Sequence, residues 1–177
     1  NSGRYGFYRV QYDANSLAQL ELLIDEKILN HVDRWSLQND LFSQCVSGTK
    51  QIQEYLDFTT SYHDEDDYIT LQNLAQNLYH LYKLTRKEKF TDEIRTYTAQ
   101  FLGTIFDRLG WDSQKNERHT DALLRSFVIT ALGKLGDKEI LNEAKKRFNK
   151  FLKNKKHTNA LLRSFVITAL GKLGDKE

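Results

Sequence analysis

Apolar residues recur along this chain at the spacing of an α-helix, from Asp13 almost to the end of the sequence. The clearest stretch contains Tyr68, Leu71, Leu74, Ala75, Leu78, Leu81 and Tyr82. Intervals of three and four residues place side chains on one face of a helix, and an apolar face of this kind must be buried. The chain contains no proline that would interrupt such helices. The sequence therefore predicts an all-α fold.

Periodicity and capping residues together divide the chain into successive helices. Their expected ranges are about 13–28, 33–48, 49–59, 68–82, 90–110, 120–135 and 137–152. Asp13 or Ser16 is expected to cap the first helix. Asp33 and Asp137 are expected to cap the second and the last. Short connections favour antiparallel packing, so the first two helices and the next two should pair, and repeated pairs build a HEAT-like α-solenoid.

A short β-strand is predicted ahead of the helices, over residues 5–12. This run, YGFYRVQY, is rich in aromatic and β-branched residues and alternates along its length. A lone strand cannot satisfy its own hydrogen bonds. The leader should therefore pair with a segment outside this chain or lie against the helices as an extended arm. Because the chain has no Met at its start or elsewhere, we expect it to be a fragment of a longer parent.

The C-terminal segment repeats an earlier part of the chain. Residues 157–177 match residues 119–139 except that Asn159 replaces Asp121. The spacing between the copies is typical of helix-pair repeats, but neighbouring natural repeats normally differ at their surface positions. Engineering or copying is therefore favoured over recent natural duplication. The expected organisation is a leader from a preceding β domain (1–13), a helical-repeat domain (14–156) and an extra helix (157–177).

The duplicated helix also predicts a free apolar face. In the first copy, Leu124, Phe127, Ala131 and Leu135 should be covered by helices on both sides. The second copy, which contains Phe165, has no following helix in this chain. An uncovered apolar stripe at the end of a repeat array is a docking surface. We therefore expect self-association through residues 157–177.

Composition limits the partners and the compartment. The net charge of +2 gives the whole chain little attraction for nucleic acid or an anionic membrane, so neither is expected as a partner and any such binding must be local. No apolar run approaches the length of a membrane-spanning helix. Cys45 is the only cysteine and cannot form an intramolecular disulfide. A cytoplasmic location fits best.

Two motifs resemble a known family. Residues 6–13, GFYRVQYD, are similar to the G-[FY]-Y-R-V-x-Y-D segment that leads into the C-terminal helical domain of zinc aminopeptidases of the aminopeptidase N class. This class includes the endoplasmic-reticulum aminopeptidases and the archaeal tricorn-interacting aminopeptidase factors. Residues 33–42, DRWSLQNDLF, resemble the D-R-x-x-L-x-N-D-x-F helix of the same family. The resemblance covers residues 5 to about 156 and stops at the duplicated tail.

The resemblance implies that this chain is a non-catalytic part of a peptide-trimming zinc aminopeptidase, a hydrolase. Such a domain forms part of the wall that covers the active site and controls the access of peptides. The implied partners are the catalytic and β domains of the parent and its peptide substrate, and zinc is implied only for the parent. The alternative is a freestanding or engineered helical-repeat scaffold that binds a partner or itself.

This chain should carry no catalytic, cofactor-binding or metal-binding residue of its own. The family's zinc centre needs an H-E-x-x-H helix with a further Glu. The histidines of this chain are His31, His63, His80, His119 and His157. None of them is followed by a second histidine four residues later. Residues that would contact peptide remain unknown from the sequence.

The remaining charged and polar residues are interpreted as structural groups and not as a metal, phosphate or substrate site. The acidic turn 63–67 could hold a hard cation, but a helix N-terminus is favoured. The basic residues of the last helix and its exit are expected to form a solvated surface instead of a phosphate site. They are Lys145, Lys146, Arg147, Lys150, Lys153, Lys155 and Lys156. Ion pairs are expected for Arg9, Arg34 and Arg125. Asn39 and Asp40 are expected to fix a turn between helices.

Overall fold

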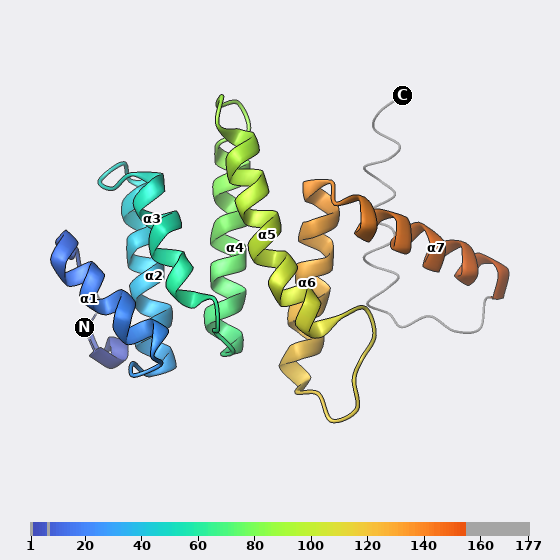
Figure 1. Ribbon diagram of the computed structural model, residues 1–177, viewed down its shortest axis with the longest axis horizontal. Helices are drawn as coiled ribbons and strands as arrows, with labels where there is room; N and C mark the ends of the chain where they lie inside the picture. Colours follow the sequence, from blue (N-terminus) through green and yellow to red (C-terminus); the bar gives the residue numbers. More distant parts are fainter. Residues whose placement is uncertain (1, 7, 155–177) are drawn as a thin grey trace. The chain divides into compact units, whose positions relative to one another are not determined.

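The computed structural model describes residues 2–6 and 8–154, with the side chains of residues 4 and 151–154 left undescribed. Helices account for its regular structure (Figure 1). The α-helices are α1 (Ala14–Asp25), α2 (His31–Val46), α3 (Ile52–Thr59), α4 (Tyr68–Leu84), α5 (Thr91–Leu109), α6 (His119–Leu135) and α7 (Lys138–Asn154). Two short 3-10 helices are η1 (Ser2–Arg4) and η2 (Thr60–Tyr62). The all-α prediction is confirmed.

The predicted strand over residues 5–12 is not confirmed in the part of this segment that the structure describes. Those residues carry no strand, and η1 precedes them. Within the described chain no second strand completes a ladder, so the polar groups of the leader bind side chains of α2 instead. The described part of the leader thus lies against the helices, and its pairing with a segment outside this chain stays a prediction. The extra helix predicted over 157–177 lies outside the described residues.

Side-chain capping sets where several helices begin. Asp13 caps α1 as predicted, because its Oδ1 accepts a hydrogen bond of 2.8 Å from the Ser16 amide. The predicted cap at Asp33 is wrong: α2 begins earlier, and the side chain of Asn30 accepts the Asp33 amide at 3.0 Å. The third helix starts at Ile52 and not at the predicted Thr49, because residues 51 and 54 form the capping box.

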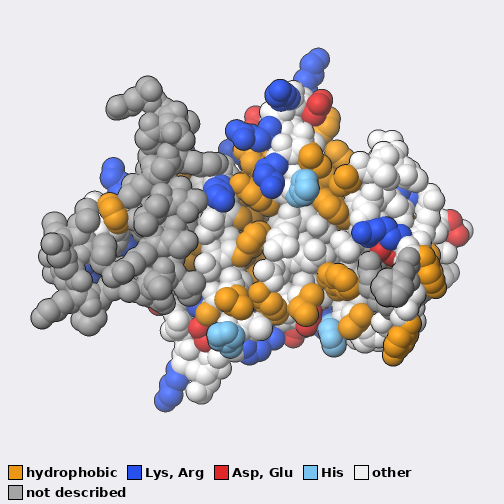
Figure 2. Space-filling view, turned by 180° about the vertical axis from the view of Figure 1, so that it is seen from behind, with side chains coloured by type: hydrophobic (Ala, Val, Ile, Leu, Met, Phe, Trp, Pro, Cys, Tyr) orange, Lys and Arg blue, Asp and Glu red, His pale blue; other side chains and the backbone are white. Residues whose placement is uncertain are grey.

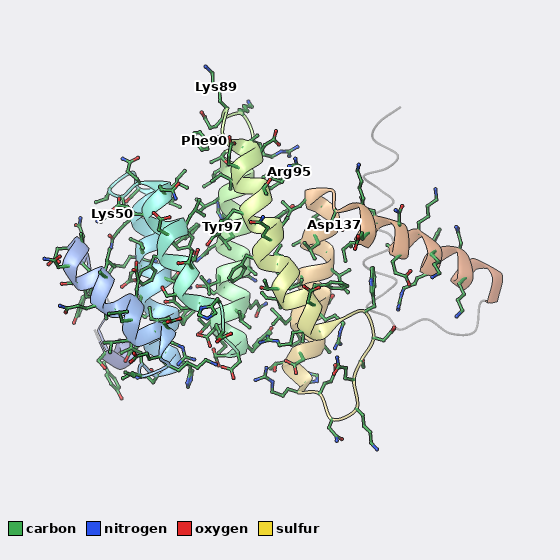
Figure 3. The ribbon with its side chains drawn as sticks, viewed as in Figure 1. Lys50, Lys89, Phe90, Arg95, Tyr97 and Asp137 are labelled. Carbon is green, nitrogen blue, oxygen red and sulfur yellow. The ribbon has the colours of Figure 1, made fainter. Side chains whose placement is uncertain are left out.

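The α6–α7 junction follows the expected pattern closely. Gly136 adopts φ +89° at the end of α6, a left-handed conformation that favours glycine. Asp137 follows it, and its Oδ1 accepts a 2.9 Å hydrogen bond from the Ile140 amide in the first turn of α7. Figure 3 labels Asp137 between these two helices. A left-handed residue followed by a capping side chain therefore turns the chain within two residues.

The chain divides into two compact units, Asn1–Asn77 and Leu78–Glu177, with the boundary inside α4. In the first unit α2 packs against α3, to which it runs antiparallel, and α1 lies against η2 (Figure 1). The predicted pairing of α1 with α2 and of α3 with α4 is therefore not the main packing within this unit. Its core is aromatic: the rings of Phe42 and Tyr55 lie 5.5 Å apart, and those of Phe58 and Tyr62 5.9 Å apart.

The second unit has an aliphatic core. Its helix α6 packs against antiparallel α5 and also against α7. Leu102, Leu124 and Val128 are buried at its centre, with Ile140 and Ala144 on α7. Helices do lie on both sides of α6, as predicted, but the Phe127 side chain is only half-buried between them. Hydrophobic side chains also reach the surface among polar ones, as one face of the molecule shows (Figure 2).

Candidate functional site

Arg34 is held inside the first unit by a carboxylate from beyond α3. Its Nε and Nη2 donate to the two oxygens of Glu65 at 2.6 and 2.8 Å, and the side chains are 9% and 2% exposed. A third nitrogen, Nη1, donates to the Leu29 carbonyl at 2.6 Å. The hydrogen bonds that Arg34 donates to Glu65 raise the pKa of Arg34. The predicted ion pair is confirmed, and its bidentate geometry joins α2 to the turn before α4.

In the second unit, Arg125 likewise binds a carboxylate and a backbone carbonyl. Its guanidinium forms an ion pair with Glu117 in the loop before α6, and its Nε donates to the Leu109 carbonyl at 3.2 Å. The side-chain hydrogen bond from Arg125 lowers the pKa of Glu117 to about 2. Arg125 thereby fixes the loop that connects α5 to α6. This ion pair is also as predicted and leaves no guanidinium edge for a substrate carboxylate.

Arg9, Asn39 and Asp40 form a contact between the leader and α2. The Arg9 Nη1 donates to the Asn39 carbonyl and to Asp40 Oδ1, each at 3.1 Å. The ion pair predicted for Arg9 is confirmed. Asn39 and Asp40 lie in the middle of α2, so the prediction that they fix a turn between helices is wrong. The sequence alone did not place the leader against this helix.

The acidic turn 63–67 does not gather its side chains around one point. His63 has Asp25 3.2 Å from Nδ1 and Asp64 3.4 Å from Nε2, so these carboxylates lie at opposite nitrogens of the ring. Asp67 caps α4, since its Oδ1 accepts the Thr70 amide at 3.0 Å. In the part of the chain that the structure describes, no group of three His, Cys, Asp or Glu is placed to hold a metal ion. The described residues do not fit zinc.

A buried polar cluster joins α2, α3 and α4, and the sequence analysis missed it. The side chain of Gln38 is fully buried at 0% exposure. Its carbonyl oxygen accepts hydrogen bonds from the Tyr55 hydroxyl and the Asn77 amide, both at 3.0 Å. Its own amide donates to Asn73. A polar residue within an apolar helical pattern was the available signal, but its partners depend on the packing of three helices.

The basic residues of α7 divide into two groups. Lys145, Lys146 and Lys150 are exposed, as predicted for a solvated surface. Arg147 instead binds Asp112 through two nitrogens at 2.6 and 2.8 Å and stacks on Trp111, with its guanidinium carbon 4.9 Å from the ring centroid. The side chains of Lys153, Lys155 and Lys156 lie outside the described residues.

The described histidines and the cysteine are not arranged for catalysis. His31, His63, His80 and His119 are exposed, whereas His157 lies outside the described residues. The thiol of Cys45 is buried, donates to the Gln51 carbonyl at 3.2 Å and has a pKa that burial raises to about 11. A thiol with such a pKa is protonated at neutral pH and is a poor nucleophile.

Among the described helices, none has the length and apolar character needed to cross a bilayer.

Comparison with known proteins finds aminopeptidases. The chain is 30% identical over 154 residues to Aminopeptidase M1-A of Oryza sativa and 33% identical over 156 residues to Aminopeptidase M1 of Arabidopsis thaliana, each match covering 86% of this chain. It is 29% identical over 146 residues, or 82% of the chain, to the Tricorn protease-interacting factor F2 of Thermoplasma acidophilum. The chain spans about 18% of the length of each of these relatives.

The family comparison agrees with these relatives and with the helical fold. The match to the family described as the ERAP1-like C-terminal domain extends over residues 1–177. Its name assigns the matching region to the C-terminal part of larger proteins, in agreement with the small share of each relative that the chain covers. This chain therefore belongs to the ERAP1-like C-terminal domain family.

Proposed function

We propose that this chain is the non-catalytic C-terminal helical part of a peptide-trimming zinc aminopeptidase. One observation carries the proposal: the whole chain matches a C-terminal domain family, while it covers about 18% of relatives that are named aminopeptidases. The fixed geometry of the buried arginines supports a structural role, since both Arg34 and Arg125 bind carboxylates of the chain itself. Zinc and the catalytic residues would then belong to other domains of the parent.

The proposed role is to form part of the wall that covers the active site and gates the access of peptides. A HEAT-like solenoid over residues 14–156 would suit this role, because stacked helix pairs build extended curved surfaces. Antiparallel α2 and α3, and antiparallel α5 and α6, are the kind of unit that such a solenoid repeats. The partners would be the catalytic and β domains of the parent and its peptide substrate, in the cytoplasm.

The non-catalytic character is tested with the isolated chain. The purified chain, incubated with zinc and an aminoacyl chromogenic substrate, should release chromophore no faster than buffer with zinc. A mock preparation, purified in the same way from host cells that lack the chain, controls for a contaminating aminopeptidase. Turnover that rises with the concentration of the chain and exceeds that of the mock preparation would contradict the proposal.

The gating role is tested in the full-length parent enzyme. We expect charge-reversing substitutions on the exposed surface of this segment to change the hydrolysis of long peptides while leaving that of a single aminoacyl substrate unchanged. The Lys145→Glu and Lys150→Glu changes suit this test because both side chains are exposed. Series of peptides of increasing length should be compared at equal concentration. Equal effects on short and long substrates, or no effect from any surface change, would contradict a gating wall.

A further inference from the structure

Asp33, in the first turn of α2, binds the start of the leader. Its Oδ1 accepts the backbone amide of Gly3 at 2.6 Å, and its Oδ2 accepts the hydroxyl of Ser2 at 3.1 Å. The same carboxylate accepts the side-chain amide of Asn30 at 2.8 Å. A charged acceptor strengthens such hydrogen bonds. One end of the leader is therefore attached to the N-terminal end of α2.

Asp40 binds the other end of the leader in the same manner. Its Oδ2 accepts the backbone amide of Val10 at 3.2 Å, and its Oδ1 accepts Nη1 of Arg9 at 3.1 Å. Farther along the helix, Gln44 donates its side-chain amide to the Val10 carbonyl at 2.8 Å. Asp40 is buried, with 3% of its surface exposed. Both backbone groups of Val10 are thus bound by side chains of α2.

The two attachment points repeat one geometry. In each, a carboxylate of α2 accepts the backbone amide of one leader residue and a side-chain donor of the residue before it. The carboxylates of Asp33 and Asp40 are two helical turns apart and so share a face of α2, about 10 Å along its axis. The amides of Gly3 and Val10 have the same separation in sequence. A shift of the leader by one residue would break both points together.

The rings of Tyr5 and Tyr8 do not contribute apolar burial to the attachment. Among the described residues of the leader, Tyr5 is 93% exposed and Tyr8 is 59% exposed. Among the described residues 2–6 and 8–10, these two rings are large apolar groups, and each would stabilise the contact if it were buried. Polar contacts with Asp33, Asp40 and Gln44 instead attach the described residues of the leader to α2.

We propose that α2 carries a binding site for an extended polypeptide chain, formed by Asp33, Asp40 and Gln44, and that its occupant is the part of the leader formed by residues 2–6 and 8–10. We call these three side chains the latch. The latch binds the backbone of Gly3 and of Val10, and it also binds the guanidinium of Arg9 beside Val10. These leader residues thereby become part of the first helical unit and move with it, instead of forming a free arm. The inference concerns this chain alone and stands independently of the proposed function.

Residue-resolved hydrogen exchange on the full chain tests the latch. In the wild type, the Gly3 and Val10 amides should exchange more slowly than in a free peptide with the sequence of residues 1–12. The Asp40→Ala change should speed the exchange of Val10 at least tenfold, and Asp33→Ala should do the same for Gly3. The double variant should also be cut by trypsin after Arg9 at least tenfold faster, since Arg9 must leave Asp40 to enter the protease.

The matched control is Asp57→Ala, which removes an exposed carboxylate from α3 of the same unit. This variant should leave both amides and the trypsin cleavage unchanged. Because Asp40 is buried and its loss could unfold the unit, Arg9→Ala provides a second test from the side of the leader, without altering α2. It should speed the exchange of Val10 severalfold while the amides of α2 stay protected. Wild-type Gly3 and Val10 amides exchanging as fast as in the free peptide, or rates unaffected by all three changes at Asp33, Asp40 and Arg9, would overturn the latch.

Discussion

Leu124 and Phe127 lie three residues apart on α6, but the structure buries them differently. Leu124 is fully buried in the second unit, whereas Phe127 is half-buried. Truncation of a buried leucine to alanine costs about 2–5 kcal/mol, because it loses apolar contacts and leaves a cavity. We expect Leu124→Ala to lower the free energy of unfolding by that amount and Phe127→Ala to lower it less. Urea unfolding of both variants measures the difference, and equal or reversed losses would contradict the packing described for α6.

Glu117 should make the free energy of unfolding of the second unit depend on pH in the acid range. Arg125 lowers the pKa of this carboxyl in the folded state to about 2, below its ordinary value of 4.5. The folded state therefore binds the proton less readily than the unfolded state does. The resulting stabilisation is complete above about pH 4.5 and is lost as the pH falls toward 2.

The measurement is urea unfolding at several pH values between 5 and 2. The Glu117→Gln variant removes this titrating group, so its stability should fall less steeply with acid than that of the wild type. Glu88→Gln changes an exposed carboxylate in the same unit and should leave the slope as it is. Parallel acid profiles for the wild type and Glu117→Gln would show that the pair with Arg125 does not stabilise the unit.

At the scale of elements, the cluster around Gln38 should hold three helices in register. Replacing Gln38 with Leu removes the acceptor shared by the Tyr55 hydroxyl and the Asn77 amide. A buried polar group that loses its partner costs about 1–3 kcal/mol. We expect Gln38→Leu to destabilise the first unit, and we expect adding Asn77→Leu to cost less than the sum of the two single changes. A double-mutant cycle in urea measures this coupling, and strict additivity would contradict a shared cluster.

Arg147 should attach α7 to the loop that follows α5. Its planar guanidinium binds Asp112 through two nitrogens and stacks on Trp111, and lysine reproduces neither contact. We therefore expect Arg147→Lys to speed amide exchange throughout α7 and to change the fluorescence of Trp111. The measurement uses a Trp35→Phe background so that only one tryptophan emits. Lys150→Arg, on the exposed surface of the same helix, should change neither signal.

At the scale of the whole molecule, self-association through residues 157–177 stays a prediction from the sequence. Residues 157–177 repeat in sequence the apolar stripe of α6, and an uncovered stripe of this kind favours a second copy as its partner. Light scattering over a concentration series should show a mass that rises above that of the monomer. The Phe165→Glu change should return the mass to the monomer value. A monomer that persists to high micromolar concentration in the wild type would contradict this prediction.

Much of the fold could be predicted from the sequence because helices follow local rules. Apolar spacing alone indicated α4 and α5, and the Asp13 and Asp137 caps lie within a few residues of the helices they begin. The motif around Arg34 and the leader motif also identified the family, which the comparisons confirm. These features depend on residues close together in the chain, so a reader of the sequence has all of the relevant information.

Tertiary structure decided the features that depend on distant residues. The leader, with its strand-like composition, lacks within the described chain the second strand that would satisfy its amides, and Asp33 and Asp40 of α2 satisfy two of them instead. Phe127 fits the apolar stripe of α6, but the neighbouring helices cover Leu124 and leave Phe127 half-buried. The sequence by itself determined which segments become helical, because each helix makes its hydrogen bonds internally. Only packing could decide which polar groups meet between helices, because that depends on side chains about 30 residues apart in sequence, such as Arg34 and Glu65.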